Sequence, residues 1–260
     1  MEFYSETTTG PNWLDLPKDL TANILKRLGT FEILASASRV CPLWWNICKD
    51  PLMWRTIHMP HVRNYKYLDN ICCIAVERSC GQLEDIDIER FATDNLLECI
   101  ANNGSHLLSL RMVDCWDISN KGFREAVSKL SQLEMVDISL SFVTGGSLEV
   151  LGRSCPLLKS LKFHLNRGLV FSKSDATAFI IAETMPALCH LDIKRHVLSN
   201  VGLLAILDKC HLLKSLDIRR CPYLELNDSL EKRFADQIKD LKRPDDELES
   251  YWFYETSDDE

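Results

Sequence analysis

A six-residue apolar pattern recurs along most of the chain, and it constrains the fold more than any other feature. The pattern reads L-x-x-L-x-L, with Ile, Val, Met or Phe also accepted. Its six copies are Leu83/Ile86/Ile88, Leu107/Leu110/Met112, Leu133/Val136/Ile138, Leu158/Leu161/Phe163, Leu188/Leu191/Ile193 and Leu213/Leu216/Ile218. They begin 24, 26, 25, 30 and 25 residues apart, and Trp54, Ile57 and Met59 fit as a degenerate copy 29 residues earlier. This period predicts a solenoid, in which each unit buries its apolar face against the next.

The segments between the copies carry apolar residues at helical spacing. We expect helices at residues 67–78, 120–130, 147–152, 175–184 and 200–209, with Ser119 capping the second of them. Each unit would then supply one short strand and one helix, so that the strands form a parallel curved sheet under an outer layer of helices. The expected fold class is therefore α/β, with repeats over residues 59–226.

Eleven cysteines need an explanation in such a fold. Their odd number and the lack of any C-x-x-C pair predict reduced, mostly buried thiols and no disulfide framework. Several recur at fixed places: Cys80, Cys155 and Cys210 precede an apolar triplet by three residues, while the ninth repeat position holds Phe91, Cys115, Ser141, Asn166, His196 and Cys221. A thiol or small polar group suits that ninth position because the backbone leaving a strand has amide groups to satisfy.

This pattern resembles the cysteine-containing leucine-rich repeats that are common in F-box proteins. The best match is Leu107-x-x-Leu110-x-Met112-x-x-Cys115-x-x-Ile118-Ser119-x-x-Gly122, and the resemblance spans residues 54–226. It is strong evidence for the fold. It says little about function, because repeat solenoids bind proteins of many kinds.

Residues 12–58 differ from the repeats. Leu14, Leu16, Leu20, Ile24, Leu25 and Leu28 form a helical apolar pattern that begins at Pro17 and ends at Gly29. Two more short helices are expected at residues 31–39 and 42–49, and four of the six tryptophans fall in this segment. Three short helices make a small core, so we expect surplus apolar surface that needs a partner.

The segment resembles an F-box over nearly its whole length. The matching motifs are Leu16-Pro17-x-x-Leu20, Ile24-Leu25-x-x-Leu28, Val40-Cys41-x-x-Trp44 and Asp50-Pro51-x-x-Trp54-Arg55. Together with the repeats, it looks like the plant F-box/LRR proteins of the SKP-interacting-partner type. The resemblance implies binding to the Skp-family adaptor, and through it to cullin, by Leu16, Pro17, Leu20, Ile24, Leu25, Val40 and Trp45. The alternative is that Leu20, Ile24 and Trp44 only form the core of the F-box.

The resemblance implies a substrate-recognition subunit of an SCF-type ubiquitin ligase, non-catalytic and working in the nucleus and/or cytoplasm. A scaffold or inhibitor protein, and an F-box protein acting outside the ligase, are the alternatives. No nucleophile elbow, P-loop or dinucleotide motif indicates an enzyme. His58 and His61 have no cysteine near them and do not predict a metal site. We expect no cofactor, because six repeats cannot close the ring around an inositol phosphate or a hormone that larger plant relatives form.

Charge is distributed unevenly along the chain. Residues 244–260 hold eight of the 38 acids and no Lys or Arg, and the remaining 30 acids match the 30 basic residues. We expect a solvated acidic tail over these residues and, before it, a capping helix over residues 227–243, with Asp228 as the cap and Leu230, Phe234, Ile238 and Leu241 on one face.

Side chains between the apolar positions of a strand should face the concave side of the sheet. There they run from acidic residues in the first repeat (Asp85, Asp87, Glu89) to basic residues near the C-terminus. One interpretation is that these are ordinary solvated strand residues. The other is that the basic end binds an acidic segment of the target or of the protein's own tail, through Lys162, Lys194, Arg195, Arg219 and Arg220.

Overall fold

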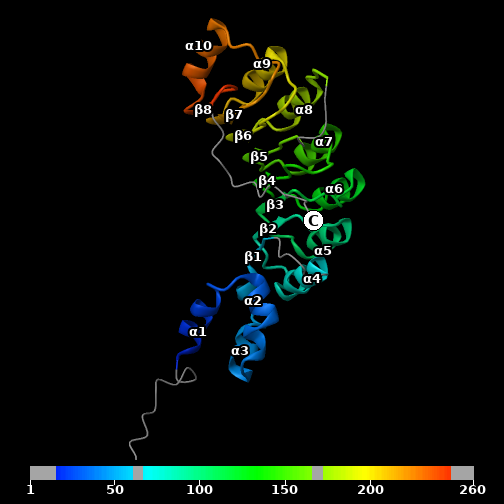
Figure 1. Cartoon of the computed structure of the whole chain (residues 1–260), viewed down its shortest axis with the longest axis vertical. Coiled ribbons are helices and arrows are strands. Elements are labelled where there is room, and N and C mark those ends of the chain that lie inside the picture. The colour runs from blue at the N-terminus through cyan, green and yellow to red at the C-terminus, as the bar shows by residue number, and fades with distance from the viewer. Residues whose placement is uncertain (1–15, 61–66, 166–171, 247–260) are drawn as a thin grey trace, which may run out of the picture.

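The computed structural model describes residues 16–60, 67–165 and 172–246. The molecule is elongated and curved, with short helices at its N-terminal end and a helix-covered sheet through the rest (Figure 1). The N-terminal group consists of α1 (Lys18–Leu25), α2 (Thr30–Ala35), the 3-10 helix η2 (Ala37–Arg39), α3 (Pro42–Ile47) and the 3-10 helix η3 (Pro51–Trp54). The three α-helices are those predicted for this segment, although each is shorter than expected.

One parallel sheet runs through the repeats, and its strands follow chain order. They are β1 (Thr56–Met59), β2 (Asp85–Glu89), β3 (Ser109–Val113), β4 (Met135–Asp137), β5 (Ser160–Lys162), β6 (His190–Asp192), β7 (Ser215–Asp217) and β8 (Asp240–Lys242). The register repeats without a slip, so that Ile57, Ile86 and Leu110 lie opposite one another on the first three strands. This topology confirms the predicted α/β solenoid, including the degenerate first strand.

The helices between the strands lie along one side of the sheet (Figure 1). They are α4 (Leu68–Arg78), α5 (Asp94–Asn103), α6 (Asn120–Val127), α7 (Gly145–Ser154), α8 (Ala176–Thr184), α9 (Asn200–Lys209) and α10 (Asp228–Gln237). The prediction missed α5, whose N-cap residue is Thr93; the Thr93 hydroxyl accepts the backbone N–H of Leu96. Ser119 caps α6 as predicted, accepting the N–H of Gly122 at 3.0 Å. Among residues 16–60, 67–165 and 172–246, no helix is long and apolar enough to span a membrane.

The apolar triplets build the core. Every predicted triplet position, from Trp54 to Ile218, is at most 2% exposed. Alternation along a strand explains the second and third positions of a triplet: Ile86 and Ile88 point inward from β2, while the residues between and beside them point out. Stacking the triplets then forms one continuous hydrophobic core from the F-box segment to α10.

The turns after the strands share an unusual backbone. Two residues beyond the third apolar position, five repeats hold a non-glycine residue at positive φ: Arg90, Asp114, Leu140, Arg195 and Arg220. This conformation costs an L-residue about 1–2 kcal/mol. Each of these residues donates its N–H to a carbonyl of the next repeat, as Asp114 does to Ser139 at 3.0 Å. The bond continues the sheet ladder beyond the strand and offsets the strain.

All eleven cysteines are free thiols, and four of the five at the two fixed repeat positions are buried. Cys155 donates its thiol to the Leu130 carbonyl at 3.3 Å, and Cys210 to the Met185 carbonyl at 3.5 Å. Burial raises the pKa of Cys155 to about 12 and that of Cys210 to about 11, so both stay protonated. They act as small buried groups that satisfy a carbonyl of the preceding repeat. Cys80 departs from this role, because it is exposed.

The C-terminal end differs from the expectation. The helix α10 ends at Gln237, and the chain continues into β8, an eighth strand in register with β7. The helix cap is Asn227, whose side chain accepts the N–H of Leu230 at 3.0 Å, so the assignment of the cap to Asp228 was wrong. Residues 227–243 therefore form another repeat unit. Of the predicted acidic tail, residues 247–260 lie outside the described residues.

Candidate functional site

Two faces of α1 carry different apolar residues. Thr21 and Leu25 are buried, and Leu25 is 0% exposed. Leu20 is 52% exposed, and Ile24 is exposed beside it. Residues four apart share a helix face, so one pair faces the core and the other faces solvent.

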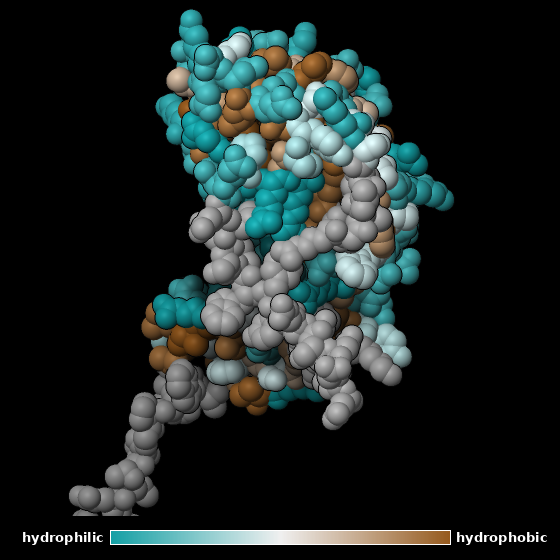
Figure 2. All heavy atoms as spheres, turned by 45° about the horizontal axis from the view of Figure 1, so that its top comes forward, coloured by the Kyte–Doolittle hydropathy of each residue, from teal (hydrophilic) through white to brown (hydrophobic). Residues whose placement is uncertain are grey.

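The predicted adaptor-binding residues therefore do not all lie on the surface. Leu25 is a core residue, and its assignment as a contact was wrong. Pro17, Leu20, Ile24, Val40 and Trp45 are exposed, and Leu16 is half-buried. The exposed set includes Val40 at 61% exposure, and Figure 2 shows hydrophobic side chains gathered at this N-terminal end of the molecule. Exposed apolar side chains gathered at one end of a molecule are typical of an interaction site.

Hydrogen bonds at the starts of α1 and α3 fix the positions of the exposed residues. Pro17 precedes α1, and its carbonyl accepts the N–H and the hydroxyl of Thr21 at 3.0 and 3.2 Å. Cys41 caps α3, its sulfur accepting the N–H of Trp44 at 3.5 Å, with Pro42 at the first helical position. A proline costs nothing there, because that N–H has no helical partner. Val40 is held at the surface just before this cap.

A cationic side chain joins the F-box segment to the first repeat. The Arg78 guanidinium, from the last turn of α4, lies 5.5 Å from the ring centre of Trp45 and 5.6 Å from that of Trp54. Lys49 covers Trp45 at 4.7 Å, and the Trp54 indole N–H donates to the Cys48 carbonyl at 2.9 Å. Cation–π contacts of this type stabilise a packed junction. The sequence carried no signal for Arg78, because the contact depends on how α4 packs against α2 and η3 of the F-box segment.

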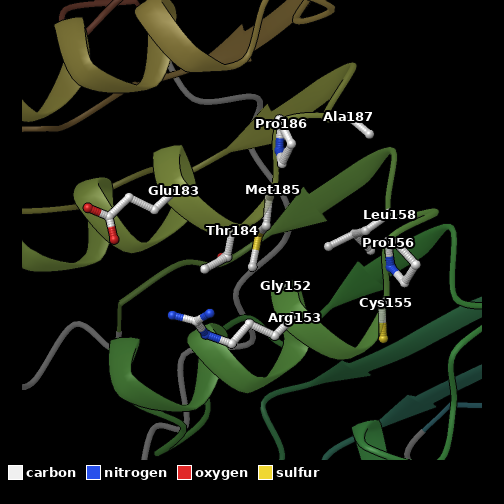
Figure 3. A pocket seen from close by; sticks show the side chains of 10 residues that line it. All are labelled: Gly152, Arg153, Cys155, Pro156, Leu158, Glu183, Thr184, Met185, Pro186 and Ala187. Carbon is white, nitrogen blue, oxygen red and sulfur yellow. The ribbon is translucent and has the colours of Figure 1, made fainter.

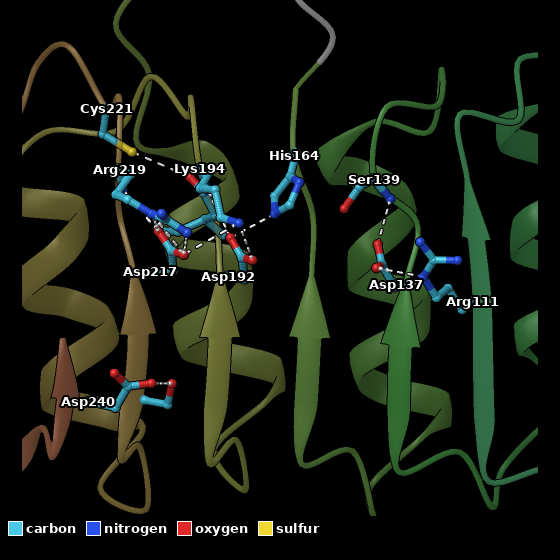
Figure 4. Close-up of polar contacts among 12 residues, drawn as sticks. Arg111, Asp137, Ser139, His164, Asp192, Lys194, Asp217, Arg219, Cys221 and Asp240 are labelled. Atoms are coloured by element: carbon cyan, nitrogen blue, oxygen red, sulfur yellow. Dashed lines mark hydrogen bonds and ion pairs between the residues drawn. The ribbon is translucent and has the colours of Figure 1, made fainter. Parts of the chain in front are cut away.

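The concave face carries two chains of ion pairs, and Figure 4 shows the Arg111–Asp137 contact of the first and the residues of the second. In the first, Asp87 binds both His58, at 3.0 Å, and Arg111, which also lies 3.6 Å from Asp137. Asp137 is buried and accepts the N–H of Ser139 at 3.1 Å. Asp87 and Asp137 are therefore paired groups, and Asp87 is not the ordinary solvated strand residue of the first interpretation.

The second chain neutralises the basic end. Lys194 lies 3.0 Å from Asp192 and 3.4 Å from Asp217, and Arg219 holds Asp217 through two nitrogens at 3.0 and 2.7 Å. Arg219 is buried just beyond the end of β7. The expected open basic patch is therefore not formed by Lys194 and Arg219, because neighbouring aspartates on the strands already hold their charges.

Asp192 shows the electrostatics of this chain. Burial alone would raise the pKa of its carboxyl, but the His164 imidazole, 2.7 Å away, and the Lys194 ammonium lower that pKa below its ordinary value. The carboxylate is thus charged throughout the physiological range. The other candidates lie apart: Lys162 is exposed on β5, Arg195 is half-buried in the turn after β6, and Arg220 is exposed in the turn after β7.

A depression of about 300 Å³ lies at the seam between the ends of α7 and α8 (Figure 3). Its lining includes Gly152 and Thr184, whose side chain occupies the space that a Cβ on Gly152 would need. The guanidinium of Arg153 pairs with Glu149 on its own helix at 2.8 Å. This is a packing seam between repeats. Across the described part of the chain, no cluster of three His, Cys, Asp or Glu side chains could hold a metal ion, and His61 lies outside that part.

Comparison with known proteins identifies the family. Residues 13–60 match the F-box-like family model. The chain is 42% identical over 247 residues to the F-box protein SKIP19 of Arabidopsis thaliana, covering 94% of this chain and 80% of that protein. The chain belongs to the F-box/LRR-repeat family. The putative F-box/LRR-repeat protein 23 of Arabidopsis thaliana is 44% identical over 241 residues, 90% of this chain and 54% of that protein, so this F-box/LRR chain spans about half of its length.

A solved structure shares the fold. One chain of the crystal structure of the Rad7 and Elc1 complex in yeast matches with a TM-score of 0.53, over 87% of this chain and 59% of that one. The sequence identity is 13%, so the likeness concerns only the fold.

Proposed function

We propose that this F-box/LRR protein is the substrate-recognition subunit of an SCF-type ubiquitin ligase. The observation that carries the proposal is the exposure of Leu20, Ile24 and Val40 on a segment that matches the F-box family. Large apolar side chains are exposed together at a site where a partner covers them. That partner is the Skp-family adaptor, and through it a cullin. The chain itself would perform no catalysis.

The repeats would hold the target while the F-box holds the ligase. The Arg78 contacts with Trp45 and Trp54 support this division, because they tie the F-box to the first repeat. A rigid connection keeps the target at a constant distance from the site of ubiquitin transfer. We place this activity in the nucleus or cytoplasm, where cysteine thiols stay reduced.

A pull-down with the purified adaptor tests the proposal. The variant with Leu16→Ala and Pro17→Ala should lose the adaptor while its repeats stay folded by circular dichroism. Wild-type protein should retain both the adaptor and cullin. Retention of the adaptor without cullin would indicate a role outside the ligase, and failure to bind the adaptor would leave a scaffold or inhibitor.

A further inference from the structure

Two exposed aromatic side chains pack together where β3 and β4 end. Trp116 is 56% exposed and Phe142 is 50% exposed, and their ring centres lie 6.2 Å apart at an angle of 59°. They belong to turns of consecutive repeats, just beyond the carboxyl ends of the strands. We call Trp116 and Phe142 the aromatic rim. Tryptophan is enriched among the residues that dominate binding energy at protein interfaces.

The aromatic rim is held in place before any partner arrives. The Trp116 indole N–H donates to Asp114 at 2.8 Å, and Arg90 from the preceding repeat fixes the same carboxylate at 3.0 Å. The backbone carbonyl of Phe142 accepts from the Asn120 side chain at 3.4 Å. Ordering a side chain on binding costs free energy, so the anchored Trp116 ring binds with a smaller entropic cost.

Carboxylates lie near the aromatic rim in the chain and on the neighbouring strand. Asp114 and Asp117 flank Trp116 in the chain, and Glu89 ends the neighbouring strand β2, opposite Val113. Arg90 neutralises Asp114, Arg111 lies in the field of Glu89, and Lys121 lies 3.8 Å from a glutamate on its own helix. Asp117 forms no ion pair among the described residues. The surface therefore combines two exposed aromatic rings with the uncompensated charge of Asp117. It suits a cation that can lie on an indole face, and it repels a segment rich in carboxylates.

We propose that the aromatic rim binds the target protein through a segment that carries Lys or Arg beside an apolar residue. The apolar residue packs against Trp116 and Phe142, and the cation lies over the indole and near Asp117. The inference rests on the proposed function and names the chemistry of the substrate segment. It also moves the binding surface from the basic end of the solenoid to its acidic N-terminal half, where the protein's own acidic tail is a poor occupant.

The test uses the full chain in complex with the adaptor and two labelled synthetic peptides that share their apolar residues. One peptide carries lysines, and its twin carries glutamates at the same positions. Fluorescence anisotropy should show binding of the lysine peptide at low salt, weaker binding as salt rises, and at least about tenfold weaker binding to a variant with Trp116→Ala and Phe142→Ala. The matched control is Leu212→Ala, another exposed apolar residue, which should bind as the wild type does.

Three results would overturn the inference: no binding of the lysine peptide, equal or tighter binding of the glutamate twin, or wild-type affinity in the double variant. Thermal melting of the double variant should match that of Leu212→Ala, because both changes lie at the surface. Adaptor binding is measured in the same preparation. If the adaptor binds and the peptides do not behave as expected, only the aromatic rim is wrong. If the adaptor does not bind, the proposed function fails.

Discussion

The Asp94 carboxylate reaches Ser119 in the next repeat, accepting its backbone N–H at 2.8 Å and its hydroxyl at 2.6 Å. Asp175 makes the same pair of bonds with Ser199, at 2.6 and 2.7 Å. Each serine is also the cap of its own helix. One side chain thus joins two repeats and orders the start of a helix. A glycine permits the approach, because a Cβ on Gly122 would stand 2.2 Å from the Asp94 carboxylate.

Removing the hydrogen bonds between Asp94 and Ser119 should destabilise the fold. We expect Asp94→Ala to lower the free energy of unfolding by about 0.5–1.5 kcal/mol, since it removes two hydrogen bonds to the exposed cap residue Ser119. Gly122→Ala should lower the free energy of unfolding by a similar amount, because the added methyl group displaces the Asp94 carboxylate. Urea unfolding measures both. The matched control Glu98→Ala, an exposed acid on the same helix, should change the unfolding free energy by less than about 0.5 kcal/mol. Equal effects at Asp94 and Glu98 would contradict this role.

Stability should depend on pH through His196. This side chain is buried beside Phe163, neither ring nitrogen has a partner among the described residues, and burial lowers its pKa to about 4. The unfolded chain, with an ordinary pKa of about 6.5, binds a proton that the folded state excludes, so stability is complete above pH 6.5 and falls towards pH 4. The loss should reach about 3 kcal/mol.

His196→Phe tests this effect, because the first repeat already holds a phenylalanine at the equivalent position. The variant should show a flatter dependence of unfolding free energy on pH between about 6.5 and 4. An unchanged slope would show that other groups cause the loss. Asp192 affects stability in a lower pH range than His196 does. Because the pKa of Asp192 is depressed in the folded state, its contribution to stability is lost only as the pH falls below the ordinary carboxyl pKa.

The buried Asp217–Arg219 ion pair should contribute more to the free energy of unfolding than an exposed ion pair does. Asp217→Asn leaves the charge of the buried Arg219 poorly compensated, and we expect a loss of about 3 kcal/mol in unfolding free energy. Asp208→Asn is the matched control, because Asp208 pairs with Arg233 at the surface and should cost at most about 1 kcal/mol. Charge reversal at Lys194 or Arg219 would break the ion pairs with Asp217 and destabilise the fold, so such variants are poor probes of target binding. Similar losses at both aspartates would contradict the assignment.

The last repeat should protect the sheet. Leu230 and Phe234 of α10 are buried against the core, and β8 pairs with β7. Deleting residues 228–260 would expose the edge of β7 and its apolar neighbours, so we expect aggregation. Light scattering during purification measures this. A monomeric truncation that unfolds cooperatively would show that β7 ends the fold without a cap.

The sequence predicted the sheet well because the buried triplets repeat with a fixed period. It missed β8 because the third apolar position of that unit is Arg243, although Ile238 and Leu241 follow Leu213 and Leu216 by 25 residues. Leu25 looked like a surface residue because motif and helical spacing cannot tell which face of α1 turns inward. The pairing of Lys194 and Arg219 depends on side-chain directions across strands, which no linear pattern encodes.

The affinity of the F-box for its adaptor tests the central claim most directly. Isothermal titration calorimetry would compare wild-type protein with a variant carrying Leu20→Ala and Val40→Ala, both exposed on the F-box, and with Phe179→Ala, an exposed apolar residue on α8. Our account predicts at least about a tenfold weaker affinity for the F-box variant and wild-type affinity for Phe179→Ala. Unchanged affinity in the F-box variant, with the fold intact, would contradict it.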